Sequence, residues 1–128
     1  MLISLDLDNE TPLYEQLCNQ IIIGIATGEL AEREKLPTVR QLADDLGINA
    51  MTVNKAYALL KQEGYIAIDR RHGAKVNARQ RRKGDSAPEA ELEEKLELLI
   101  AQATIRGVDQ SCFQQLCARI FSKMSYQL

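Results

Sequence analysis

The sequence predicts a mainly α-helical protein with one small β-hairpin, and three observations support this. Apolar residues recur at the spacing of amphipathic helices over most of the 128 residues. Near the middle, two short alternating segments flank a glycine-containing loop, as in a β-hairpin. Helical spacing returns after a segment that holds Gly, Ser and Pro. We therefore expect an N-terminal unit of residues 1–78, a basic linker of residues 79–88 and a C-terminal helical hairpin of residues 89–128.

The first helix is expected over about residues 12–27. Thr11 is its predicted N-cap, Pro12 its first helical residue, and Gly28 its stop. Upstream, apolar and polar residues alternate over residues 3–7. This alternation predicts either a short edge strand or an ordered tail.

Two more helices are expected to form a compact pair. A helix over residues 39–46 is predicted by a capping box, in which Thr38 caps the helix and Gln41 reaches back to it. After a turn through Gly47, Asn49 is the predicted N-cap of a third helix, which continues to the next glycine. This spacing is that of a helix-turn-helix. The inward stripe of the third helix is expected to be Val53, Ala56, Tyr57 and Leu60.

A β-hairpin is expected after these helices. Residues 65–68 and 75–77 have strand-like sequences, and residues 69–73 form the predicted loop between them. Three helices followed by a hairpin is the order of a winged helix. The fold class predicted here is thus a winged helix-turn-helix followed by a two-helix hairpin.

Charge is distributed unevenly along the chain. The overall net charge is −2, and residues 1–32 carry six acidic and no basic side chains. Residues 33–83 carry twelve Lys and Arg against five acids, whereas residues 84–128 carry four against seven. A central basic block suits a polyanionic partner, although a solvated basic face explains it equally well.

Several classes of function are disfavoured. His72 is the single histidine, and the common phosphate-loop, zinc-protease and nucleophile motifs are absent from the sequence, so we expect no enzyme, cofactor or metal site. No apolar run approaches the length of a membrane span, and the N-terminus lacks signal-peptide features, so we expect a cytoplasmic protein. The three cysteines, Cys18, Cys112 and Cys117, are expected to be buried and reduced.

The third helix presents a polar outward face that suits a DNA major groove. Asn can pair with adenine, a methyl group can contact thymine, and Lys can reach guanine or phosphate. An ordinary solvated face remains the alternative. The residues of this face are Met51, Lys55, Ala58 and Gln62, flanked by Thr52 and Asn54.

Two other features favour the same partner. Arg40 lies in the first turn of the second helix, where a guanidinium can bind backbone phosphate, or form a surface salt bridge. The basic residues 70–73 lie where a wing reaches the minor groove, or where a hairpin is simply solvated.

Five segments agree in order and spacing with one known family: PLYEQ (12–16), LPTVRQLA (36–43), GIN (47–49), MTVNKAY (51–57) and EGYI (63–66). Over about residues 10–78 the chain resembles the GntR family of bacterial transcription regulators, and its short tail is similar to the YtrA-like subfamily. Two segments depart from the family pattern. Residues 32–35 replace the usual Pro-Gly, and residues 71–76 differ from the usual wing.

The resemblance implies a set of DNA contacts. Arg40 matches an arginine that contacts phosphate and base, several positions match the recognition helix, and His72 with Gly73 match the wing tip. Ala50 replaces an Arg of some relatives. The predicted DNA-binding residues are Arg40, Asn49, Ala50, Met51, Thr52, Asn54, Lys55, Arg70, Arg71, His72 and Gly73.

The tail predicts two amphipathic helices, over about residues 89–105, opened by Pro88, and over residues 109–124. Their apolar stripe can pack on the same chain or on a second copy, and the resemblance favours a homodimer. The predicted dimerisation residues are Leu92, Leu96, Leu99, Ala103, Phe113, Leu116 and Ile120.

These features together predict a sequence-specific regulator that binds double-stranded DNA. We expect a homodimeric repressor on a near-palindromic operator, and the resemblance implies control of a transporter operon and an unknown small-molecule effector. A protein-interaction adaptor built on the same scaffold is the alternative. A dedicated effector sensor would need a pocket, for which the short tail leaves only a cleft between two copies.

Overall fold

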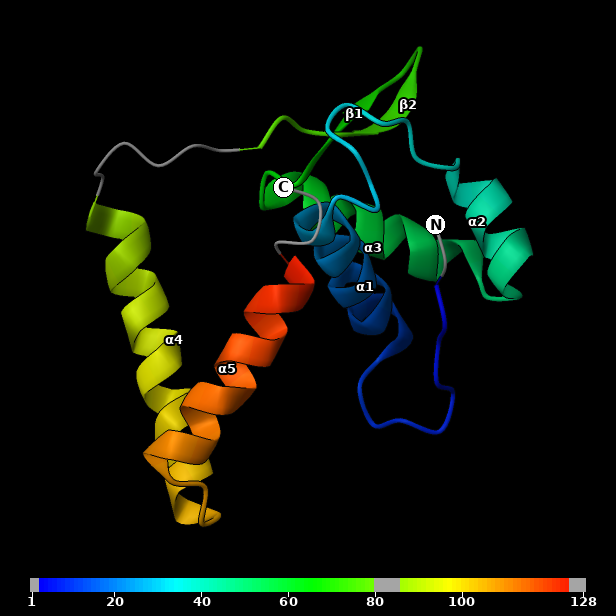
Figure 1. The fold of residues 1–128 in the computed structure, drawn as a ribbon. Helices are drawn as coiled ribbons and strands as arrows, with labels where there is room; N and C mark the ends of the chain where they lie inside the picture. The colour runs from blue at the N-terminus through cyan, green and yellow to red at the C-terminus, as the bar shows by residue number, and fades with distance from the viewer. Residues whose placement is uncertain (1–2, 80–85, 125–128) are drawn as a thin grey trace. The chain divides into compact units, whose positions relative to one another are not determined.

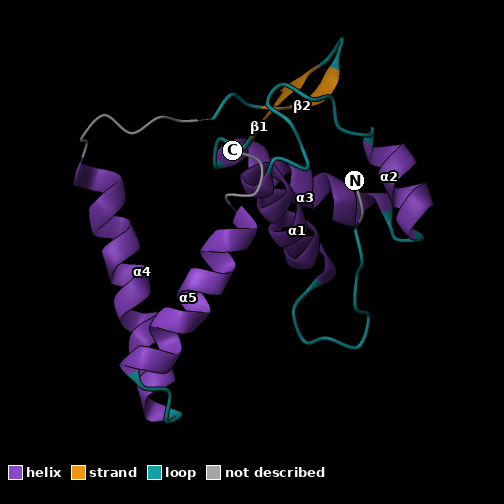
Figure 2. Cartoon of the chain, in the orientation of Figure 1, coloured by secondary structure: helices purple, strands orange, loops and turns teal. Residues whose placement is uncertain are grey.

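The computed structural model describes residues 3–79 and 86–124 (Figure 1). Their contacts divide them into two compact units, the first ending at Arg79 and the second formed by α4 (Ser86–Ile105) and α5 (Gln110–Met124). The structure confirms the predicted fold class, which is mainly helical with one small sheet (Figure 2). Among the described helices, none has the length and apolar character needed to cross a lipid bilayer.

The first unit is a winged helix. Its elements follow the order α1 (Leu13–Thr27), α2 (Val39–Leu46), α3 (Ala50–Gln62), β1 (Ile66–Asp69) and β2 (Gly73–Val76). α3 is the central element, because it packs against α1, α2 and β1. Figure 1 shows α3 beside α1, with the hairpin that follows it extending away from the helices.

The predicted cap of α1 is wrong. Pro12, not Thr11, is the N-cap, and no side chain caps this end of the helix. The Pro12 carbonyl accepts the N–H groups of Glu15 and Gln16 at 3.1 and 3.0 Å. Thr11 is instead held by its backbone, whose N–H donates to Asn9 Oδ1 at 2.9 Å. Gly28 ends the helix in the left-handed conformation, with φ 84°.

The N-terminal segment is an ordered tail, so the strand alternative is wrong for residues 3–7. Two glutamines of α1 bind its peptide groups. Gln16 accepts from Asp6 N at 2.9 Å and donates to Asp6 O at 3.0 Å. Gln20 bonds to both the N–H and the carbonyl of Ser4. Side-chain amides therefore take the place of a neighbouring strand.

The caps of α2 and α3 confirm the sequence prediction. Thr38 Oγ1 accepts from Gln41 N at 3.1 Å, and Gln41 Oε1 accepts from Thr38 N at 3.0 Å, which completes a capping box. Asn49 Oδ1 accepts from Met51 N at 2.8 Å and caps α3. Between the two helices, Gly47 has φ 68°, a conformation that other residues adopt at a cost.

The hairpin differs from the prediction by one to two residues. β1 and β2 pair antiparallel from Ile66↔Val76 to Asp69↔Gly73, so Gly73 belongs to a strand and the turn contains only residues 70–72. The sequence pattern placed the loop over residues 69–73 because Asp and Gly are typical turn residues.

A segment before α2 pairs with the other edge of β2, which the sequence did not predict. Arg33 N donates to Val76 O, Val76 N donates to Glu34 O, and Leu36 N donates to Ala74 O, each at 2.9 Å. This pairing attaches the wing to the helical body through backbone hydrogen bonds.

The core of the first unit gathers apolar residues from all its elements. Its largest fully buried members are Leu17, Ile21, Val53, Leu60, Ile66 and Val76. The predicted inward stripe of α3 lies here, which confirms the helical spacing.

The expectation of three buried cysteines holds only for Cys18. Its Sγ lies 3.5 Å from the Ala56 carbonyl, and burial, followed by the carboxylates of Glu63 and Glu15, raises the pKa of its thiol. Cys112 is exposed and Cys117 is half-buried, because both lie on α5, which has no buried residue.

The second unit is a pair of helices that meet near their connection and diverge away from it (Figure 1). α4 begins at Ser86 rather than at Pro88, so the proline occupies the first turn, where a backbone N–H has no helical acceptor. Asp109 Oδ1 accepts from Cys112 N at 2.8 Å and caps the start of α5. Of the predicted linker, residues 80–85 lie outside the described residues.

Candidate nucleic-acid interface

The helix α3 carries five of the eleven predicted DNA-binding residues. Met51 is 77% exposed, Asn54 and Lys55 are exposed, and Thr52 is half-buried. The opposite side of the helix is fully buried in the core through Val53 and its neighbours. The helix is therefore anchored by one face and free to present the other to a groove.

A predicted DNA-binding residue, Asn49, caps the start of α3. Because Asn49 Oδ1 accepts from Met51 N, this side chain caps the helix in the absence of a ligand. Ala50 follows it and is exposed. Ala50 leaves only a methyl group at the start of the helix, which allows close approach of a phosphate.

Lys55 lies over an aromatic ring that sequence reasoning did not connect with it. Its Nζ is 3.9 Å from the centroid of the Tyr14 ring, a cation–π contact between α3 and the first turn of α1. Tyr14 is half-buried and packs against the core. The contact restrains the ammonium group on the exposed face of α3.

The position of α2 is set by a hydrogen bond from α3. Tyr57 Oη donates to Pro37 O at 2.7 Å, just before the capping box, and burial raises the pKa of Tyr57 to about 12. Arg40 lies in the first turn of α2 and is exposed. Its backbone is thereby fixed relative to α3, while its guanidinium remains accessible to solvent.

The wing tip holds a hydrogen-bonded cluster around Asp69. Asp69 Oδ2 is 3.0 Å from His72 Nδ1, and its Oδ1 accepts from Arg71 N at 2.8 Å. The His72 side chain and then the Arg71 backbone lower the pKa of the Asp69 carboxyl. Arg70, Arg71 and His72 are exposed, so the turn presents two guanidinium groups and an imidazole around a fixed carboxylate.

Arg79 is held by the first unit. Its Nη2 donates to the Ala26 carbonyl at 2.6 Å, near the C-terminal end of α1, and its backbone N–H donates to Glu32 Oε1 at 2.9 Å. The sequence placed this residue at the start of a basic linker. The structure shows that it fixes the chain that leaves the wing.

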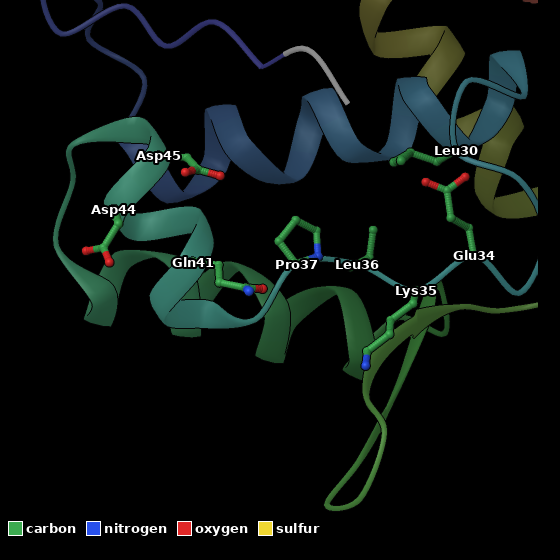
Figure 3. A pocket seen from close by; sticks show the side chains of 8 residues that line it. All are labelled: Leu30, Glu34, Lys35, Leu36, Pro37, Gln41, Asp44 and Asp45. Carbon is green, nitrogen blue, oxygen red and sulfur yellow. The ribbon is translucent and has the colours of Figure 1, made fainter.

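A cleft of about 720 Å³ opens beside α2 (Figure 3). The carboxylates of Asp44 and Asp45 on α2 and of Glu34 line it, together with Lys35, which points away from Glu34. Its charge is opposite to that required by a phosphate backbone. We therefore exclude this cleft from the candidate interface.

The predicted dimerisation residues all lie on the second unit and remain accessible in the single chain. Leu92 is 60% exposed, Leu99 is 53% exposed, and Ala103 and Phe113 are half-buried. The others, Leu96, Leu116 and Ile120, are 42–44% exposed. Sequence reasoning did not include three further exposed apolar residues of α4, Leu98, Ile100 and Ile105.

The structure groups the predicted DNA-binding residues on α2, α3 and the wing of the first unit. Tyr14 and Asp69 were not predicted, yet each contacts a predicted residue. Asp69 and His72 are three residues apart at a predicted turn, and this spacing could have indicated their contact. No local pattern could have indicated the other contact, because Tyr14 and Lys55 are far apart in the sequence.

Comparison with known proteins agrees with this geometry. The family model described as "Bacterial regulatory proteins, gntR family" matches residues 13–76. The HTH-type transcriptional repressor YtrA of Bacillus subtilis is 32% identical over 108 residues, covering 84% of this chain and 83% of that protein.

Two solved structures are also similar. YtrA from Sulfolobus acidocaldarius, a GntR-family transcription factor, is 36% identical with a TM-score of 0.65, over 82% of this chain and 99% of that one. AraR(DBD) in complex with operator ORE1 is 25% identical with a TM-score of 0.50, over 59% of this chain and 93% of that one. The first unit therefore has the fold of a domain that has been crystallised on operator DNA.

Proposed function

The chain belongs to the GntR family of bacterial regulatory proteins and is a transcription regulator with a DNA-binding domain, and on that premise we propose that it represses transcription as a homodimer on a near-palindromic operator. The observation that carries the proposal is the position of α3. Its N-terminus is capped, one face is exposed, and the opposite face is fully buried in the core. The name of the similar Bacillus subtilis protein, a repressor, supports repression as the mode of action. Chromosomal DNA as the ligand implies action in the cytoplasm.

In the proposed complex, α3 enters the major groove. The Asn54 amide can pair with adenine, and Lys55 can reach guanine or a phosphate from its position over Tyr14. Arg40 contributes a phosphate contact from α2, and the wing contacts the adjacent minor groove. Phosphate contacts position the protein, whereas the α3 side chains select the sequence.

The second unit is proposed to supply the dimer interface. Its described side chains include no buried residue, so this hairpin has no core of its own. A pair of helices that exposes several leucines is not stable in water without a partner surface. A second copy provides one, since an isologous interface covers the same stripe on both chains. Two-fold symmetry then places two α3 helices on successive major grooves.

Control of a transporter operon, with an unidentified small-molecule effector, completes the proposal and rests on the resemblance to short GntR regulators alone. Measurement of transcript levels after deletion of the gene tests it. Increased transcripts of neighbouring transporter genes are expected. Unchanged transcripts of these genes would contradict control of a transporter operon.

Operator binding is tested by selection from a library of random duplexes with the purified full-length protein, followed by footprinting. The expected product is two inverted half-sites with centres about 10–10.5 base pairs, or a multiple of this, apart. The binding constant should fall steeply with salt, with a log–log slope of about −0.9 for each phosphate contacted. Enrichment of no sequence, or a slope near zero, would contradict the proposal.

Two variants separate base contacts from general affinity. Asn54→Ala and Lys55→Ala should each lower affinity for the selected duplex more than for random DNA, by roughly 1–3 kcal/mol of discrimination. Lys61→Ala is the matched control, since it removes the same charge as Lys55→Ala from an exposed position of the same helix outside that face. An equal loss on both DNAs would show that these two residues do not read bases.

A further inference from the structure

The single histidine of the chain, His72, lies at the wing tip in a defined hydrogen-bonded setting. Its side chain is 70% exposed, and its Nδ1 lies 3.0 Å from Asp69 Oδ2. The opposite ring nitrogen, Nε2, makes no hydrogen bond within the described residues. The ring therefore binds the protein through one nitrogen and presents the other to solvent, or to whatever the wing contacts.

Asp69 is itself fixed in place. Its Oδ1 accepts the backbone N–H of Arg71 at 2.8 Å, while Oδ2 faces His72. Its backbone is at the end of β1, opposite Gly73 in the register. Hydrogen bonds from both neighbours favour the ionised carboxylate and lower its pKa. An ionised carboxylate only accepts hydrogen bonds, so the atom facing it must carry a proton.

These contacts decide the tautomer of His72. In the neutral ring, Nδ1 holds the proton that it donates to Asp69, and Nε2 is left with a lone pair. In a minor groove, A·T pairs present only acceptors, whereas a G·C pair adds the guanine N2 amino donor. Resting on the proposed wing contact, we propose that Asp69 is a positioning residue that makes His72 Nε2 an acceptor for guanine N2, so that the wing selects G·C over A·T.

The selection belongs to the neutral ring. Addition of a proton would turn Nε2 into a donor, which faces the guanine amino group unfavourably and suits the acceptors of A·T pairs. The other charged groups of the wing are Arg70 and Arg71 in the turn, Lys75 on β2, and Lys35, whose backbone pairs with that of Lys75.

The tautomer is measured directly by ¹⁵N NMR of the full-length protein, in which the single histidine gives one unambiguous set of ring signals. At pH 8, Nδ1 is expected to carry the proton in the wild type. In Asp69→Asn, the amide oxygen can keep the Arg71 bond, and the amide NH₂ then donates to Nδ1 and moves the proton to Nε2. Glu10→Gln is the control for the loss of one carboxylate elsewhere. A wild-type ring protonated at Nε2 would overturn the proposal.

Base selection is measured on the duplex selected from the random library, with each G·C pair of the outer minor grooves replaced in turn by inosine·C. Inosine lacks only the N2 amino group and leaves the major groove unchanged. One such pair should weaken wild-type binding roughly threefold to tenfold at pH 8, the effect of one hydrogen bond. His72→Ala should show no such weakening.

Asp69→Asn should abolish or reverse the preference for G·C over inosine·C. The variant should therefore bind the inosine duplex at least as well as the G·C duplex at pH 8. Wild-type binding that is indifferent to every inosine, on a duplex that it still selects, would overturn the wing proposal and leave the proposed function intact. Failure to select any duplex would instead reject the proposed function itself.

Discussion

The two units of this chain differ in where their stability originates. In the first unit, three helices and a hairpin share a core whose largest residues are at most 1% exposed. In the second, α4 and α5 expose leucines at 42–61% and have no buried side chain among those described. Helical spacing alone therefore does not create a core. The first unit completes its apolar faces within one chain, whereas the second needs a surface from outside itself.

The largest expected effect tests the source of that outside surface. Leu96→Asp combined with Leu99→Asp should give monomers in analytical ultracentrifugation, because each uncompensated carboxylate buried in the interface costs about 3–5 kcal/mol. Operator affinity should also fall, since a monomer cannot bind two half-sites together. Gln102→Asp places the same charge on α4 outside the predicted stripe and should remain dimeric. A double variant that still forms dimers would place the interface elsewhere.

Truncation of a core leucine should cost more stability in the first unit than truncation of an exposed leucine in the second. Leu17 is fully buried in the first unit, so Leu17→Ala should lower the free energy of unfolding by about 2–5 kcal/mol. Leu98→Ala removes the same atoms from a position that is 61% exposed. It should change the free energy of unfolding by less than about 0.5 kcal/mol. Urea denaturation followed by circular dichroism measures both. A large loss for Leu98→Ala would show that this part of α4 is covered in solution.

The hydrogen bond that positions α2 should contribute less. Tyr57→Phe removes the bond to the Pro37 carbonyl and should cost about 1 kcal/mol of unfolding free energy. Burial raises the pKa of Tyr57 to about 12. The stabilising effect of the protonated hydroxyl is therefore complete below the ordinary tyrosine pKa and is lost as pH rises towards 12. The difference between wild type and variant should therefore narrow above about pH 10. A constant difference up to pH 12 would contradict the buried hydroxyl.

The smallest expected effect concerns the turn that leads into α2. Arg33 has φ 66°, which is unfavourable for a residue with a side chain. Arg33→Gly should relieve this strain and raise the free energy of unfolding by up to about 1 kcal/mol, partly offset by the greater freedom of glycine in the unfolded chain. Thermal melting measures the change. A lower melting temperature would mean that the Arg33 side chain stabilises the turn.

Local signals in the sequence determined much of this protein. The capping box of Thr38 and Gln41 and the Asn49 cap are formed by residues two or three apart, so their geometry follows once the helix forms. The buried stripe of α3 follows from a period that any α-helix must have. The outward face of α3, which holds five of the eleven candidate interface residues, was therefore predictable.

Only the tertiary structure decided the contacts between distant segments. Lys55 lies over Tyr14, the Arg79 side chain binds the Ala26 carbonyl, and β2 pairs with the segment that precedes α2. Each contact joins residues that become neighbours only after the helices have packed around α3, so no spacing along the chain encodes it. The sequence determined which faces exist, and the packing of the core determined which distant residues meet.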